Sequence, residues 1–207
     1  MDWNTSIFRI DYRRIHLKNI YLIVGCSGSG KTTITEQLET KYGLKSIQSY
    51  TTRPPRYDGE TGHTFISNEE FDKLVDICGY TEFAGNRYCS TVEQVENNDL
   101  YVVDPNGVDY FIKSYKGKKT PKIIFIDSDL TTRYDRMVKR AEDKGDEHLI
   151  AVDKSLSRIK TDISEFYDYV HCIAHVDYFI ENNAGANLDF IVDKIYEYIS
   201  SCESEVV

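Results

Sequence analysis

Long apolar runs are absent from this sequence: no stretch approaches the ~20 residues that a membrane span requires. The start, Met1-Asp2-Trp3-Asn4, also lacks the basic and apolar regions of a secretory signal. Cysteine is scarce, and its five copies are scattered with no C-x-x-C pair, which argues against a disulfide framework or a zinc site. We therefore expect reduced thiols and a cytoplasmic location. Cys26 lies near a predicted helix N-terminus that could lower its pKa and allow a redox role, but we favour the simpler interpretation of a small tolerated side chain.

Positive charge is also in short supply. The chain has 25 Lys and Arg residues against 34 Asp and Glu residues, a formal net charge of −9. Such a balance argues against nucleic acid or an anionic membrane as a partner, so any bound anion must be held by a local basic pocket. At 207 residues the chain is long enough for one domain with insertions.

The most informative segment is Gly25-Cys26-Ser27-Gly28-Ser29-Gly30-Lys31-Thr32, a complete G-x-x-x-x-G-K-T phosphate-binding loop. An apolar run at 20–24 precedes it and a helical pattern at 32–41 follows, so backbone N–H groups and a helix N-terminus would converge on a polyphosphate. In this motif Lys31 bridges the β- and γ-phosphates and the Thr32 hydroxyl ligates Mg²⁺. The alternative, a glycine-rich turn with a chance lysine, does not explain the strand and helix on either side. The sequence therefore predicts a site for a nucleoside triphosphate.

Buried strands and helices alternate along the rest of the chain. Further apolar runs at 100–103, 123–126 and 178–180 predict parallel strands, with a short one near 46–47. Capping boxes that begin at Ser67 and Ser90 predict helices, the first of them continuing through Ile77. Apolar residues at helical spacing predict a last helix over 188–199. This order describes a three-layer α/β domain with a parallel central sheet.

Two polar excursions interrupt the predicted core. We expect a single domain whose core covers about 19–47, 98–128 and 171–207, preceded by an extension at 1–18. The excursion at 48–97 lies where nucleotide kinases carry a monophosphate-binding insert. The excursion at 129–170 lies where they carry a helical lid.

A second anion site is predicted within the first excursion. Arg53 and Arg56 flank the rigid pair Pro54-Pro55, which fixes φ and lowers the entropic cost of ordering the loop. The planar guanidinium matches phosphate oxygens better than an ammonium group does. The alternative is a solvated basic loop without a ligand.

At these residues the chain resembles the guanylate kinase family. The segment from Ser49 to Arg56 is similar to the family's S-x-T-T-R-x-P-R signature, which grips the acceptor monophosphate. Three later segments are similar to the family's G-N-Y-Y-G, D-x-Q-G and late strand–asparagine elements: 85–91, 102–107 and 177–183. The resemblance runs in order from about Ile20 to the C-terminus. It implies a P-loop nucleotide kinase fold with that insert and lid.

The resemblance also implies roles for individual residues. Lys31 and the lid arginines would stabilise the transferring phosphoryl group: Arg136, Arg140 and Arg158. ATP would be held by Gly25, Ser27, Gly28, Ser29, Gly30, Lys31, Thr32, Thr33 and Asn182. The acceptor would be held by Ser49, Arg53, Arg56, His63, Glu82, Tyr88, Ser90 and Asp104. Each lid arginine, taken alone, is equally typical of an ordinary surface helix.

The chain departs from the family at several positions. His63 stands where the family has a tyrosine, and Gly79 stands where it has the glutamate that reads guanine. Glu82 is close enough in sequence to substitute for that glutamate. Val102 replaces the first aspartate of the central strand, and the lid is lengthened around 143–148 by what we interpret as a solvated loop.

The predicted function is ATP- and Mg²⁺-dependent phosphorylation of a nucleoside monophosphate, GMP or dGMP first, by a monomer or homodimer. A second hypothesis keeps the chemistry but changes the acceptor to another nucleoside monophosphate or a phosphorylated sugar, which the departures at Gly79 and Val102 would suit. A third is a non-catalytic module of the same fold that binds a phosphopeptide. The intact Lys31 argues against it.

Overall fold

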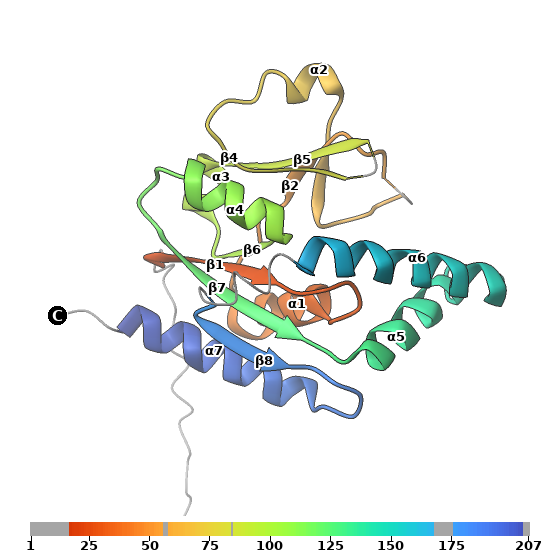
Figure 1. The fold of residues 1–207 in the computed structure, drawn as a ribbon. Coiled ribbons are helices and arrows are strands. Elements are labelled where there is room, and N and C mark those ends of the chain that lie inside the picture. The colour runs from red at the N-terminus through yellow and green to blue at the C-terminus, as the bar shows by residue number, and fades with distance from the viewer. Residues whose placement is uncertain (1–16, 56–57, 84, 168–175, 205–207) are drawn as a thin grey trace, which may run out of the picture.

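The computed structural model describes residues 17–55, 58–83, 85–167 and 176–204. Most of the predicted N-terminal extension, as well as Arg56, therefore lies outside the described residues. Fifteen elements follow one another in the order shown in Figure 1. They are β1 (Asn19–Val24), α1 (Lys31–Tyr42), β2 (Ser49–Thr51), β3 (His63–Phe65), α2 (Asn68–Phe71), β4 (Ile77–Phe83), β5 (Asn86–Thr91), α3 (Val92–Asn97), β6 (Leu100–Val102), α4 (Pro105–Ser114), β7 (Thr120–Asp127), α5 (Leu130–Glu142), α6 (His148–Tyr167), β8 (Tyr178–Glu181) and α7 (Leu188–Ser204).

The core is a parallel sheet of four strands in the order β6-β1-β7-β8. Every pairing in it is parallel, as the apolar runs predicted. The short run at 46–47 contributes an isolated parallel bridge between Ser46 and Leu100 rather than a full strand. Because β1 carries the phosphate loop at its carboxyl end, the loop lies at the centre of the sheet edge.

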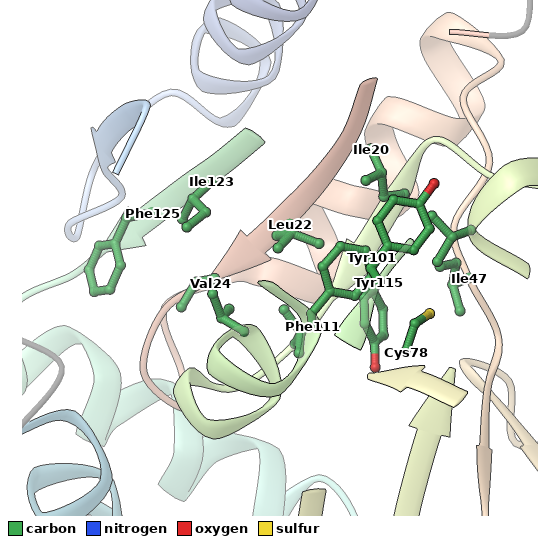
Figure 2. Packing of buried hydrophobic residues seen from close by; sticks show 13 residues of the cluster. Ile20, Leu22, Val24, Ile47, Cys78, Tyr101, Phe111, Tyr115, Ile123 and Phe125 are labelled. Carbon is green, nitrogen blue, oxygen red and sulfur yellow. The ribbon is translucent and has the colours of Figure 1, made fainter. Parts of the chain in front are cut away.

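Alternation along β1 builds the layers on either side of the sheet. Ile20, Leu22 and Val24 face a cluster that includes residues of α3 and α4, as Figure 2 shows for Phe111. The other face of β1, with Ile23, packs against α1 and α7. Side chains on successive strand positions point to opposite faces, so a strand with no polar position is buried on both sides. The result is the predicted three-layer α/β arrangement.

The excursion at 48–97 forms a second sheet, in the order β3-β2-β5-β4, with the long antiparallel pair β4 and β5 at one edge. It lies above the core sheet in Figure 1, whereas the helices α5 and α6 of the predicted lid lie to one side. No helix within the four described ranges is long and apolar enough to cross a bilayer.

Two sequence predictions in this sheet were wrong in detail. The capping box at Ser67 and Glu70 exists, but its helix ends at Phe71 instead of Ile77. The chain turns before β4 because Asp76 adopts a left-handed conformation, with φ of 54°. The second capping box is shifted by one residue: its N-cap is Thr91, paired with Gln94.

Candidate active site

The phosphate loop connects β1 to α1, and its glycines permit a conformation that side chains would obstruct. Gly28 and Gly30 have φ of 79° and 96°. A Cβ atom on Gly28 would lie 2.7 Å from the carbonyl oxygen of Arg133 in α5. Gly30 is the N-cap of α1, so the helix N-terminus opens directly onto the loop. The arrangement has the geometry of an anion cradle.

Lys31 is folded onto this loop. Its Nζ atom donates hydrogen bonds to the carbonyl oxygens of Gly25 and Cys26, at 2.5 and 2.9 Å. Burial lowers the pKa of Lys31 from its usual value to about 8. Burial also raises the pKa of the neighbouring Cys26 thiol, which disfavours a reactive thiolate and agrees with the favoured interpretation of a small side chain. Lys31 is thus buried beside the loop.

The asparagine predicted to contact ATP follows β8 and supports the loop. Asn182 is buried and its Nδ2 atom donates to the carbonyl oxygen of Ser29 at 2.8 Å. Thr32 and Thr33 lie exposed on the first turn of α1, next to the glycines. An exposed hydroxyl at this position suits a hard cation such as Mg²⁺, which prefers oxygen ligands and brings its own waters. Within the described ranges no cluster of three or more His, Cys, Asp or Glu side chains offers another metal site.

Two lid helices contact the loop through arginines. From α5, Arg136 donates to the carbonyl oxygen of Gly28 at 3.2 Å and to Oδ1 of Asn182 at 3.4 Å. From α6, the Nε atom of Arg158 donates to the hydroxyl of Ser27 at 2.7 Å. Three of the four predicted catalytic cations therefore meet at the loop, including Lys31.

The second anion cluster is built around Arg53. Its two terminal nitrogens lie 3.1 and 2.9 Å from the two carboxylate oxygens of Glu60, and the side chains are only 10% and 6% exposed. The guanidinium also lies 5.2 Å from the ring centroid of Phe65. Arg53 is therefore a bidentate anion binder that Glu60 holds in this structure.

Three predicted acceptor residues lie together on the second sheet. Ser49 Oγ and His63 Nδ1 are 2.9 Å apart, and the His63 ring is 5.6 Å from the ring of Tyr88. They come from β2, β3 and β5, which are adjacent in the sheet. His63 therefore has a polar partner, Ser49, on the neighbouring strand of the same sheet.

The position of the missing glutamate is filled by a tyrosine. A Cβ atom on Gly79 would lie 2.6 Å from Ser90 Oγ and 2.7 Å from Tyr101 Oη, so the Tyr101 side chain takes the space beside it. Ser90 is fully buried behind this contact. Glu82 points away from it: the side chain is exposed and accepts a hydrogen bond from the hydroxyl of Tyr80. Strand alternation explains this, since Glu82 is three positions after Gly79 and so faces the other side of β4.

One cavity of about 520 Å³ joins these groups. It extends from Ser27 of the phosphate loop to Ser49, His63 and Tyr88 of the second sheet, and Arg140 and Arg158 of the lid line it. Asp104 also lines it while capping α4, where its Oδ1 atom accepts from Gly107 N at 2.7 Å. The cavity thus extends from the phosphate loop to residues of both excursions of the chain, and Arg53 is not among the residues that line it.

Sequence reasoning missed several residues of this site. Arg133, Asp162, Tyr101, Thr81 and Met137 lie at the loop or on the cavity wall. Arg133 precedes Arg136 by three residues and Asp162 follows Arg158 by four, so helical periodicity would have placed each beside a predicted residue. Tyr101 carried no comparable signal, because it reads as one more residue of a buried strand.

Comparison with known proteins agrees with this geometry. A sequence model of the family described as guanylate kinase matches residues 17–199. A guanylate kinase of Neisseria gonorrhoeae is 40% identical over 83 residues, which cover 37% of this chain and 40% of that protein. The matched part thus spans about 40% of the length of the first curated relatives. A guanylate kinase of Idiomarina loihiensis is 24% identical over 190 residues, 85% and 86% of the two chains.

Among solved structures, guanylate kinase from Anaplasma phagocytophilum is similar with a TM-score of 0.54 and 19% sequence identity. The similarity covers 93% of this chain and 89% of that one. At this identity the likeness shows the fold, a mixed α/β domain with a parallel central sheet.

Proposed function

Because the chain belongs to the guanylate kinase family, we propose that it transfers a phosphoryl group from ATP to a nucleoside monophosphate, with GMP or dGMP as the first candidates. The observation that carries the proposal is the cavity, which extends from Ser27 of the phosphate loop to the predicted acceptor residues Ser49, His63 and Tyr88. A phosphate loop and a group of predicted acceptor residues that share one cavity, with Arg140 and Arg158 on its lining, suit the transfer of a phosphoryl group between two phosphorylated substrates.

The donor is assigned to the core. Backbone N–H groups of the loop and the N-terminus of α1 would hold the phosphates, and Lys31 would exchange its bonds to Gly25 and Cys26 for phosphate oxygens. Asn182 would keep the loop in place through Ser29. Thr32 would ligate Mg²⁺, which when bound supplies charge neutralisation between the phosphates.

The acceptor is assigned to the second sheet. Arg53 would release Glu60 and take the monophosphate, with Tyr88, Ser49 and His63 on the same wall. Arg56 stays a predicted partner of that phosphate from outside the described residues. Arg136, Arg140 and Arg158 would stabilise the charge that develops during transfer, since this reaction depends on positioning and electrostatics rather than on a covalent group.

Base reading is assigned to Asp104. Guanine presents ring and amino N–H donors, so it needs an acceptor such as a carboxylate, and Asp104 lines the cavity. Glu82 has no such support, because it faces away. Cys26, Cys78, Cys89 and Cys202 are free, which supports the expected cytoplasmic setting.

The test is ADP formation from Mg·ATP with a panel of acceptors: GMP, dGMP, AMP, dTMP, UMP, CMP and ribose phosphates. Turnover confined to GMP or dGMP is the expected result, and the variant Lys31→Met should abolish it. Turnover with another acceptor alone would retain the reaction class and assign a new specificity to the surroundings of Gly79. Binding of ATP with no turnover on any acceptor would favour the phosphopeptide-binding module.

A further inference from the structure

The lid inserts a carboxylate into the phosphate loop. Asp162 lies in α6 and its side chain is 1% exposed. Its Oδ2 atom accepts a hydrogen bond from the backbone N–H of Ser27 at 2.7 Å, and its Oδ1 atom accepts one from the Ser27 hydroxyl at 2.9 Å. Ser27 is the third residue of the loop that the proposed function assigns to ATP. An anion from the chain itself thus uses a main-chain donor of the anion cradle.

Cations surround this carboxylate. Arg133 Nη1 lies 3.4 Å from Oδ2, and Arg158 Nε lies 3.3 Å from Oδ1 while also donating to Ser27. Lys31 is close enough for the charge of Asp162 to oppose the effect of burial on the lysine. Arg133 is itself buried, at 9% exposure. Asp162 therefore lies among three cations drawn from the loop, α5 and α6.

Electrostatics explain why such a group is present. Cations gathered in a closed, partly desolvated site repel one another and are costly to bury unless an anion is near. A nucleotide supplies that anion when it is bound. Without a nucleotide, the carboxylate of Asp162 has the charge and the hydrogen-bonding capacity for the same purpose.

The Asp162 carboxylate and the phosphates of a nucleotide cannot occupy the phosphate loop at the same time. A polyphosphate in the loop would bring several negative charges next to the buried carboxylate and would need the same donors. Like charges at such separations repel strongly inside a protein. Arrival of the phosphates must therefore move Asp162 away from Ser27.

We propose that Asp162 is an internal counter-ion that occupies the phosphate loop when no nucleotide is bound and is displaced by the phosphates of the incoming nucleotide. This inference rests on the proposed assignment of the loop to ATP. Asp162 keeps Arg133 and Arg158 ordered for the nucleotide and at the same time competes with it. Simple anions such as inorganic phosphate make too few contacts with the loop to displace the Asp162 carboxylate. A polyphosphate makes enough contacts to displace it.

The size of the effect follows from population arithmetic. The apparent affinity of a ligand falls by the fraction of protein that is competent to bind it. If the carboxylate-free loop is a minor state of the usual ~0.1–10% population, then removal of the carboxylate should tighten phosphate binding by about 10-fold to 1,000-fold. A group that serves only to hold the lid together would give the opposite sign.

The experiment is isothermal titration calorimetry of the full chain with inorganic tripolyphosphate, and separately with inorganic phosphate. Asp162→Asn and Asp162→Ser both remove the charge, and Asp162→Glu retains it. The matched control is Asp153→Asn, which makes the same charge change on an exposed position of the same helix. The variants are purified in phosphate buffer, where the free anion replaces the missing carboxylate, and then dialysed; circular dichroism verifies that they are folded.

The expected result is tripolyphosphate binding at least about tenfold tighter in Asp162→Asn and Asp162→Ser, with Asp162→Glu and Asp153→Asn close to the wild type. Equal or weaker binding by the two folded neutral variants would overturn the counter-ion role. The proposed function fails separately: it is refuted if the wild type binds neither ATP nor tripolyphosphate. A wild type that binds and turns over, beside neutral variants that bind no more tightly, refutes the counter-ion role alone.

Discussion

Replacing Arg53 with methionine should lower the free energy of unfolding by about 3 kcal/mol or more. The guanidinium makes two contacts with the Glu60 carboxylate, at 2.9 and 3.1 Å, and the side chains are only 10% and 6% exposed. Removing one member of a buried pair leaves the other charge without its main compensation, and such changes typically cost ~3–5 kcal/mol. Glu60→Leu should therefore be destabilising for the same reason.

The double variant Arg53→Met/Glu60→Leu separates stability from function. Replacing both charges by apolar groups of similar volume is often neutral, so the double variant should unfold within about 1 kcal/mol of the wild type. The coupling energy from the four proteins should then be at least ~3 kcal/mol. Urea denaturation followed by circular dichroism measures all four free energies.

The same double variant should lose its affinity for the acceptor. A bidentate guanidinium–phosphate contact contributes ~2–3 kcal/mol, so KM for the acceptor should rise by about 30-fold to 150-fold while KM for ATP stays the same. A double variant as unstable as Arg53→Met would refute the reasoning about the buried pair. A double variant with the wild-type KM for the acceptor would show that Arg53 does not hold the monophosphate.

Two further predictions concern the phosphate loop. The folded-state pKa of Lys31 is lowered from 10.5 to about 8, so unfolding takes up a proton between these pH values. The free energy of unfolding should therefore rise with pH through this window. Relative to Lys31→Met, the slope should reach up to ~1.4 kcal/mol per pH unit. Urea titrations of both proteins across the window would show no such divergence if Lys31 were ordinary. Gly28→Ala should abolish ATP binding in calorimetry, because φ is +79° and the new Cβ would meet the Arg133 carbonyl oxygen. The matched change Gly43→Ala, at φ of +71° with no atom within 4 Å, should cost only ~1 kcal/mol and leave ATP binding intact.

Local patterns predicted the core of this protein well. The apolar runs, the phosphate loop and the last helix follow from a few neighbouring residues, because a strand buried on both faces and an amphipathic helix each have a distinctive period. The helix expected to continue to Ile77 failed for a local reason too. Val75 is 73% exposed and Asp76 is left-handed, so the apolar side chain at 75 does not pack on the core and the backbone at 76 cannot continue the helix.

Contacts between distant segments were beyond such patterns. Asp162 and Ser27 are 135 residues apart, and each looks ordinary in its own neighbourhood. The face of β4 on which Glu82 lies depends on the register of β4 against β5. This register pairs Thr81 with Tyr88 on the cavity side of the sheet and Glu82 with Arg87 on the other side. For this strand, the pairing across β4 and β5 decides whether a carboxylate reaches the cavity.

The second sheet is drawn entirely from one uninterrupted piece of chain, from β2 to β5. The residues proposed to hold the acceptor can consequently be changed without any change to the phosphate loop, which lies outside this segment. Such a change must preserve the contact between this segment and α4. There the ring centroids of Tyr80 and Tyr110 are 5.8 Å apart, and Cys78 belongs to the hydrophobic cluster around Phe111. A chimera that exchanges this segment and keeps those contact positions should therefore change the proposed acceptor-phosphate residues alone, while Asp104, the proposed base reader, stays with the host.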